Sequence, residues 1–279
     1  MTVFTPLATR LLNPFLSLIT AFRGHRPFQL VVLALLTIGT FQTSMAADNK
    51  VIKIGISTSF PPFNFLDSEG NITGYNADVA MAVCRKMAAK CEFTPMPFPK
   101  IIGALEDNRI QLAASNLLWT SDRARRINFS AKYYRSTTSL VGKHNNSDQN
   151  PAAIIGNKEM TIAVTEGSTQ WRYLTQHARS RILAKASIKE ALAAAQSGEA
   201  DYLLLPTLFA LNFLEKPENF DMDFVGLPIE DKTLSGDVHL GITKAEPKLK
   251  RQVDDAIQQL VDSGELRALI KKYFPFNVY

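Results

Sequence analysis

"ALEDNRIQLAAS" (residues 104–115) has a loose counterpart of the same length in "AAQSGEADYLLL" (residues 194–205). Each stretch runs from the end of a predicted helix, through a polar turn, into a strand whose apolar residues predict burial. Because the same step from helix to strand occurs in two separate parts of the chain, we expect two similarly built lobes.

Strands and helices alternate around the first of these stretches. "VIKIGIS" (residues 51–57) predicts a strand, and residues 75–90 predict an amphipathic helix with Asn76 or Asp78 as its N-cap. Further strands are predicted at residues 91–96 and 110–115, with a helix at residues 100–108 between them. This alternation is typical of α/β units around a largely parallel sheet.

The same alternation restarts after a polar connection at residues 143–159. "TIAVTEGS" predicts a strand running into a helix that begins near Ser168, and Ser187 with Glu190 forms a capping box for the next helix. A late strand is predicted at residues 237–244, followed by a long helix at residues 247–264 with Leu249, Val253, Ile257 and Leu260 on its inward face. The expected fold class is therefore α/β.

An apolar run of ten residues, "LVVLALLTIG", lies at residues 30–39. Basic residues precede it, and small residues follow it at Ser44 and Ala46. This order is typical of a secretory signal peptide, which we expect to span residues 1–46 and to be cleaved after Ala46. The run is too short to cross a bilayer comfortably. The alternative is an uncleaved anchor that also uses residues 11–22.

The composition limits the classes of partner and chemistry. The 279 residues carry 31 basic and 26 acidic side chains, and loss of the leader would remove three arginines and no acid. No basic stripe with interleaved aromatics is present, so nucleic acid is not an expected partner. Catalytic signatures such as a nucleophile elbow, a zinc-protease motif or a Walker loop are missing. We expect no catalytic residues, no cofactor and no metal site.

The two cysteines, Cys84 and Cys91, lie close together in "CRKMAAKC". In an exported chain, a pair this close predicts a disulfide. The alternative is a pair of reduced cysteines in the core.

Ligands of open α/β sheets bind beyond the carboxyl ends of the strands, and three segments are predicted to lie there. The first is "STSFPPFNF" (residues 57–65), in which the Pro-Pro pair ends the strand. Phe60 is the first aromatic past the strand, and we expect it to form a wall for a ligand. Phe63 and Phe65 are expected to cap the core.

The second and third segments carry polar groups. "SNLLWTSDR" ends a strand with Ser115 and Asn116 and places Arg123 close behind, where its planar guanidinium can pair with a carboxylate. "TEGSTQ" offers backbone N–H groups and the hydroxyls of Ser168 and Thr169 at a helix N-terminus, an arrangement that favours anions. The alternative for Ser168 is a simple N-cap.

Several motifs occur in order along residues 50–279. They are "GISTSFPPFNF…DSEGNITGYNADVA", "CRKMAAKC", "TSDRARRINFS" followed by "YY", "EGSTQ" and "KKYFPFNVY". With these motifs the chain resembles the polar amino-acid-binding proteins of ABC importers (family 3 solute-binding proteins), particularly the lysine/arginine/ornithine- and histidine-binding members.

The resemblance implies the two-lobed periplasmic-binding-protein fold of type II. It divides the chain into a discontinuous lobe 1 at residues 47–136 and 235–279 and a lobe 2 at residues 137–234, with a two-strand hinge. A small solute binds between lobes that close around it. The implied protein is a periplasmic monomer that delivers its solute to a membrane permease.

Roles carried over from the resemblance fall on individual positions. Phe60 and Phe98 match the aromatics that sandwich the ligand. Arg123 matches the arginine that binds the α-carboxylate, and Ser168 and Thr169 match donors to that same carboxylate.

Other cleft positions complete this picture. Ser115 matches a polar residue lining the cleft, Asn116 replaces another small polar residue, and Leu118 stands where a serine helps hold the carboxylate. Of the remaining arginines in "TSDRARR", Arg125 and Arg126 are expected to form a solvated face.

Two departures concern the ammonium group of an amino acid. The family's aspartate that receives the α-ammonium falls on Pro206, and the acid that receives a cationic side chain falls on Ser57. Glu166, Asp201 or Asp237 could supply a carboxylate from another direction.

The expected function is therefore an exported solute-binding protein that captures a small carboxylate-bearing solute without normal α-ammonium recognition. The alternatives are an enzyme that resembles the cyclohexadienyl dehydratases on the same scaffold, and a sensory module that reports to a membrane receptor.

Overall fold

In the computed structural model, residues 51–279 are described with the exception of residue 147, and the described residues belong to one compact unit. The predicted signal peptide at residues 1–46 lies outside the described residues. Within the described part, no helix is long and apolar enough to cross a membrane.

The first lobe is built on a five-stranded sheet in the order β5-β1-β6-β13-β7. Its strands are β1 (Ile52–Ile56), β5 (Cys91–Pro95), β6 (Leu112–Leu118), β7 (Asn128–Ser136) and β13 (Gly236–Ile242). Its helices are α2 (Tyr75–Lys86), α3 (Ile101–Glu106), α4 (Ser121–Arg126), α9 (Pro247–Asp262) and α10 (Glu265–Tyr273). A small sheet of β2 (Ser59–Phe60), β3 (Asn64–Leu66) and β4 (Ile72–Thr73) and the 3-10 helix η1 (Phe98–Lys100) complete the lobe.

The second lobe repeats this plan in a sheet ordered β10-β9-β11-β8-β12. Its strands are β8 (Thr138–Lys143), β9 (Thr161–Thr165), β10 (Arg181–Lys185), β11 (Tyr202–Pro206) and β12 (Met222–Val225). Its helices are α5 (Pro151–Ile155), α6 (Thr169–His177), α7 (Ile188–Gln196) and α8 (Thr207–Leu214), with 3-10 turns η2 (His144–Asn146) and η3 (Pro217–Asn219). The α/β fold with two lobes is confirmed.

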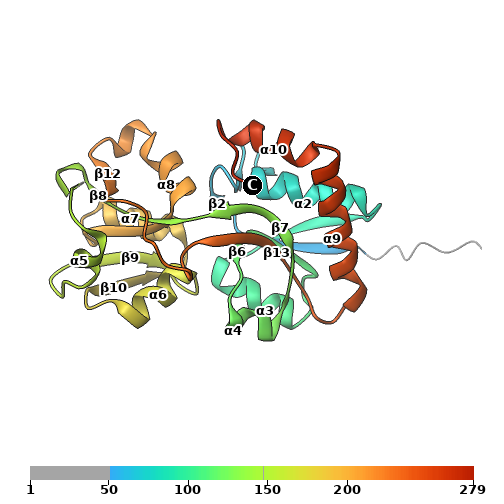
Figure 1. The fold of residues 1–279 in the computed structure, drawn as a ribbon, viewed down its shortest axis with the longest axis horizontal. Helices are drawn as coiled ribbons and strands as arrows, with labels where there is room; N and C mark the ends of the chain where they lie inside the picture. The colour runs from blue at the N-terminus through green and yellow to red at the C-terminus, as the bar shows by residue number, and fades with distance from the viewer. Residues whose placement is uncertain (1–50, 147) are drawn as a thin grey trace, which may run out of the picture. The chain divides into compact units, whose positions relative to one another are not determined.

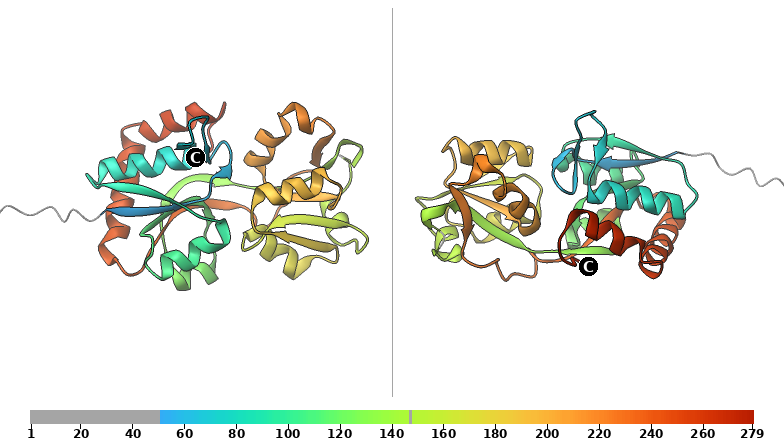
Figure 2. Two further views of the ribbon diagram at one scale, coloured as in Figure 1. Left: turned by 180° about the vertical axis from the view of Figure 1, so that it is seen from behind. Right: turned by 90° about the horizontal axis from the view of Figure 1, so that it is seen from above.

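The two stretches that predicted the repeat occupy equivalent places. The first leads from α3 into β6 and the second from α7 into β11, and each strand is third in its sheet. Both sheets are less parallel than predicted. β13 runs antiparallel to β6 and β7, and β8 runs antiparallel to β11 and β12. The reason is that two segments cross between the lobes, one from β7 to β8 and one returning to β13 (Figures 1 and 2).

The start of α2 differs from the prediction. Gly74 is its N-cap, with φ 114°, and no side chain caps the helix. A Cβ on Gly74 would clash with the carbonyl group of Phe63, so only glycine fits this backbone. The predicted cap residue Asn76 is fully buried instead, and its amide donates to Asn64 Oδ1 at 2.7 Å.

The cysteines at either end of the connection from α2 to β5 are joined. Cys84 Sγ and Cys91 Sγ lie 1.97 Å apart, and no other cysteine remains free. The predicted disulfide is confirmed, and it ties the last turns of α2 to the edge strand of the first sheet.

Candidate functional site

A cavity of about 440 Å³ lies among residues of both lobes, a volume typical of small-molecule sites. All seven residues predicted for the site line it: Phe60, Phe98, Ser115, Asn116, Arg123, Ser168 and Thr169. Ser57, Leu118 and Pro206, where the chain departs from the family pattern, line the same cavity. The structure thus brings together segments that lie more than a hundred residues apart in the sequence.

Arg123 is the buried arginine of α4, with 4% of its surface exposed. The helix starts where Thr120 Oγ1 accepts the backbone N–H of Arg123, at 3.2 Å. Its guanidinium donates from Nη1 to the Leu118 carbonyl and from Nη2 to the Gly167 carbonyl, both at 3.0 Å. The second bond joins the two lobes, because Gly167 precedes α6.

The charge of Arg123 lacks a balancing carboxylate. No ion pair of this guanidinium occurs within residues 51–146 and 148–279; Asp122 pairs with Arg125 and Arg172 instead. Burial is the main cause that lowers the pKa of Arg123 to about 10; the charge of Arg172 adds to the shift and that of Asp122 opposes it. A guanidinium with this pKa stays protonated at neutral pH, so the cavity contains a cation that has no ion-pair partner among the described residues. The Phe98 ring lies beside it, with its centroid 5.8 Å from Cζ.

The other two arginines of α4 are exposed, as predicted. Arg125 pairs with Asp122 at 2.7 Å and Arg126 pairs with Glu106 at 2.6 Å. Surface pairs of this kind stabilise a fold by at most about 1 kcal/mol.

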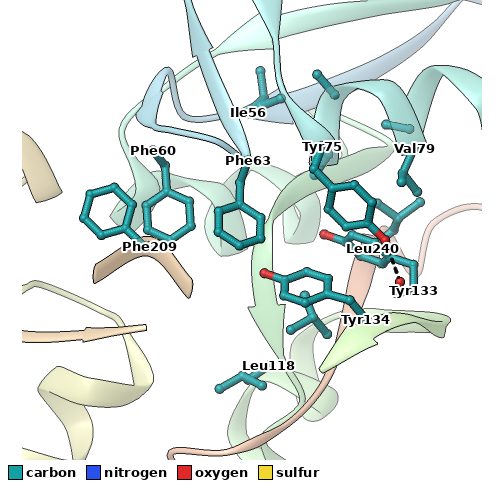
Figure 3. Close-up of a cluster of buried hydrophobic side chains, with 14 of the residues drawn as sticks. Ile56, Phe60, Phe63, Tyr75, Val79, Leu118, Tyr133, Tyr134, Phe209 and Leu240 are labelled. Atoms are coloured by element: carbon teal, nitrogen blue, oxygen red, sulfur yellow. Dashed lines mark hydrogen bonds between the residues drawn. The ribbon is translucent and has the colours of Figure 1, made fainter. Parts of the chain in front are cut away.

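Phe60 belongs to a row of aromatic rings that reaches from one lobe to the other (Figure 3). Its ring stacks on Phe209 of α8, with centroids 4.5 Å apart and planes 2° apart, and Phe63 follows on at 5.1 Å. Phe63 in turn stacks on Tyr134 at 5.3 Å. Phe60 lines the cavity but is only 8% exposed, because Phe209 covers one face of its ring.

At the start of α6, the two hydroxyl residues already have protein partners. Ser168 Oγ accepts the backbone N–H of Trp171 at 3.0 Å, so Ser168 is the N-cap of the helix. Thr169 is 6% exposed, and its hydroxyl donates to Gln170 Oε1 at 3.3 Å. The other backbone N–H groups of this first turn, those of Thr169 and Gln170, remain the donors that a helix N-terminus offers to an anion.

Asn116 is the strained residue of the site. It lies within β6 with φ 60°, in the left-handed region that non-glycine residues seldom adopt. Its Oδ1 is buried and has no hydrogen-bond partner among the described residues. Strained backbone and unpaired polar atoms of this kind concentrate at functional sites.

The three acids considered as substitutes for the missing aspartate do not line the cavity. Glu166 is exposed, Asp201 accepts the backbone N–H of Thr161 at 2.8 Å, and Asp237 lies near Arg135 at 3.5 Å. Among the described residues that line the cavity, Glu190 is the one carboxylate. Its exposed side chain accepts the Ser187 hydroxyl at 2.8 Å.

Sequence reasoning missed two contributors to this region. The sequence indicated Glu190 only as part of a capping box, and a capping box does not predict that the residue lines a cavity. Phe209 gave no signal beyond the apolar run of α8. Within the described part of the chain, no group of three or more potential metal ligands occurs.

Comparisons with known proteins agree with this architecture. The family described as bacterial extracellular solute-binding proteins, family 3, matches residues 52–276. The lysine/arginine/ornithine-binding periplasmic protein of Escherichia coli K12 is 29% identical over 90% of this chain and 97% of its own length. The L-arginine-binding protein of Pseudomonas aeruginosa is 27% identical over 90% of this chain and 98% of its own length.

A solved structure extends the likeness to three dimensions. An ancestral arginine-binding protein bound to arginine superposes with a TM-score of 0.73 at 25% identity, covering 80% of this chain and 98% of that one. Because the family match spans nearly all of the described residues, the chain belongs to the bacterial extracellular solute-binding proteins of family 3.

Proposed function

We propose that this protein is the exported solute receptor of an ABC importer and that it captures a small acid lacking a free α-ammonium group. The observation that carries the proposal is Arg123, a buried cation in the cavity without a carboxylate partner among the described residues. A buried unpaired charge is costly, and a ligand carboxylate relieves that cost through charge-assisted hydrogen bonds.

In this proposal the lobes divide as the resemblance implies, at residues 136/137 and 234/235. Arg123 binds the carboxylate, assisted by the first turn of α6 with Ser168 and Thr169. Phe98 and Phe60 contact the body of the ligand, and Ser115 and Asn116 line the cleft. The protein acts as a periplasmic monomer whose closed form docks on a membrane permease.

The ammonium half of the argument rests on Pro206. The relatives named above bind lysine, arginine or ornithine, which all carry an α-ammonium. Pro206 offers no side-chain acceptor, and Leu204 and Leu205 beside it in the cavity lining are apolar. A buried ammonium without a carboxylate partner costs several kcal/mol even after relaxation. Ordinary amino acids should therefore bind poorly.

Calorimetry with matched pairs of ligands tests this proposal. Each pair holds an amino acid and the same acid without its amino group, such as phenylalanine with 3-phenylpropanoate. We expect the acid without the amino group to bind more tightly in every pair. Micromolar binding of lysine, arginine or histidine to the purified protein would contradict the proposal.

A dehydratase on this scaffold is the second candidate, and Glu190 is the observation that bears on it. Loss of water and carboxylate needs an acid in the cleft, and Glu190 is the lining carboxylate that the structure describes. Its side chain is exposed to solvent, whereas a catalytic acid is expected in a more enclosed place. Incubation with prephenate or arogenate tests this candidate, since product formation that fails in Glu190→Gln would support it.

A further inference from the structure

A buried chain of side-chain amides and hydroxyls ends at the cavity. Tyr133 Oη donates to Asn76 Oδ1 at 2.8 Å, Asn76 Nδ2 donates to Asn64 Oδ1 at 2.7 Å, and Asn64 Nδ2 donates to both the carbonyl and the hydroxyl of Ser57 at 2.6 and 2.9 Å. Tyr133, Asn76 and Asn64 are each 0% exposed. Ser57, the residue at which this series of hydrogen bonds ends, lines the cavity.

The direction of this chain is fixed by one group. The backbone carbonyl of Ser57 can only accept, so Asn64 must turn its NH₂ group toward Ser57. Asn64 Oδ1 then faces Asn76, which must in turn donate, and Asn76 Oδ1 is left to accept the Tyr133 hydroxyl.

The consequence concerns the proton of the Ser57 hydroxyl. Its oxygen already accepts from Asn64, and no acceptor for its proton occurs among the described residues. Ser115 is in the same position, because its Oγ accepts the backbone N–H of Ser57 at 3.2 Å. Ser115 is 2% exposed and lines the cavity too. Two hydroxyl donors therefore stand next to each other at the cavity wall.

We propose that Ser57 and Ser115 form a second donor subsite, which receives an oxygen acceptor of the ligand other than the carboxylate bound by Arg123. The inference rests on the proposed function and narrows its solute class. The ligand is an acid with a second oxygen acceptor, either a keto oxygen or a second carboxylate, rather than a plain aliphatic or aromatic acid.

Acids of five carbons provide a matched probe set. Pentanoate has no second acceptor. 2-Oxopentanoate carries one keto oxygen on C2, 4-oxopentanoate carries one on C4, and glutarate carries a second carboxylate. A hydrogen bond to a neutral keto oxygen should raise the affinity by roughly 2- to 10-fold, and one to a charged carboxylate by roughly 10- to 100-fold. We expect at least one oxygenated acid to bind more tightly than pentanoate by such a factor in calorimetric titrations.

Three serine variants separate the subsite from general effects. Ser57→Ala and Ser115→Ala should each reduce the ratio of affinities between the oxygenated acid and pentanoate. Ser136→Ala is the matched control, because Ser136 lines the same cavity but its hydroxyl donates to the Thr137 carbonyl at 3.3 Å. The ratio should stay unchanged in that variant, whatever happens to overall stability.

The outcomes distinguish this inference from the proposed function. The donor subsite is overturned if pentanoate and all three oxygenated acids bind equally, or if the affinity ratio is unchanged in Ser57→Ala and Ser115→Ala. In either case, the proposed function still stands if the affinity depends on Arg123. Failure of every acid to bind, or binding of amino acids alone, overturns both.

Discussion

Replacement of Arg123 by alanine removes the cation from the cavity and tests the proposed carboxylate site directly. Two of the guanidinium donors are used by the Leu118 and Gly167 carbonyls. A guanidinium has five N–H donors, so roughly three remain for a ligand. These are enough for a two-pronged pairing with a carboxylate, the geometry that arginine favours.

The expected loss follows from burial. Arg123 is 4% exposed, and removal of one partner from a desolvated charge pair costs about 2–5 kcal/mol. The dissociation constant should therefore rise by roughly 30- to 4000-fold. Arg123→Lys keeps the charge but loses the planar fork, so it should fall between the wild type and alanine.

Calorimetry with the tightest-binding acid of the matched set measures this loss. Arg126→Ala is the control, because Arg126 lies on the same helix, is exposed and pairs with Glu106. Its effect on binding should stay below about 1 kcal/mol. Thermal melts of the unbound variants separate binding from stability, since Arg123 also holds two carbonyls. Equal losses of affinity in Arg123→Ala and Arg126→Ala would refute the assignment of a single ligand arginine.

Three further outcomes follow from the geometry. Denatured protein from an oxidising compartment should show no free thiol, and reduction of Cys84–Cys91 should cost about 2–2.5 kcal/mol of stability; two titratable thiols would contradict this. Because an anion binds the protonated guanidinium, affinity should be constant between about pH 6 and 8 and fall as the pH passes the Arg123 pKa of about 10; a steep loss between pH 6 and 8 would point to another group. Phe209→Ala should cost about 3–5 kcal/mol of stability and weaken binding, because its ring is 2% exposed and stacks across the lobes. Denaturant titrations measure the stability and calorimetry measures the binding. Phe220→Ala, at an 84% exposed ring, should leave both the stability and the binding unchanged.

Local sequence signals predicted the parts of this fold that depend on neighbours along the chain. Half of the predicted capping box is confirmed: Ser187 Oγ accepts the Glu190 N–H at 3.2 Å, while the Glu190 carboxylate accepts the Ser187 hydroxyl at 2.8 Å. The inward face of α9 is buried at Leu249, Val253, Ile257 and Leu260. These features follow from hydrogen bonds within one turn and from helical periodicity, which a single sequence displays.

Contacts between distant residues were beyond such signals. Asn76 appeared to be a helix cap, yet its amide joins Asn64 and Tyr133 instead, and Gly74 takes the cap position. A buried side-chain amide needs hydrogen-bond partners, and these two tertiary contacts supply them. The stacking of Phe209 could not be predicted for the same reason, because its partner Phe60 lies in the other lobe. A run of apolar residues predicts burial but not the ring that it meets.

Replacement of Pro206 tests whether a missing charge is all that separates this cavity from an amino-acid site. Pro206 is the last residue of β11 and the N-cap of α8, and it lines the cavity. Aspartate and asparagine are both preferred at N-caps, so Pro206→Asp and Pro206→Asn should fold alike and differ only in charge.

With Pro206→Asp, the affinity ratio of phenylalanine to 3-phenylpropanoate should rise at least tenfold. The new carboxylate compensates the α-ammonium and repels an acid that lacks one. With Pro206→Asn the ratio should change little, because an amide supplies an acceptor but no charge. The contrary result is that Pro206→Asp caps α8 and raises the melting temperature, while amino acids still fail to bind. That result would show that this position does not face the ligand's α-carbon, and the exclusion of amino acids would then need another cause than Pro206.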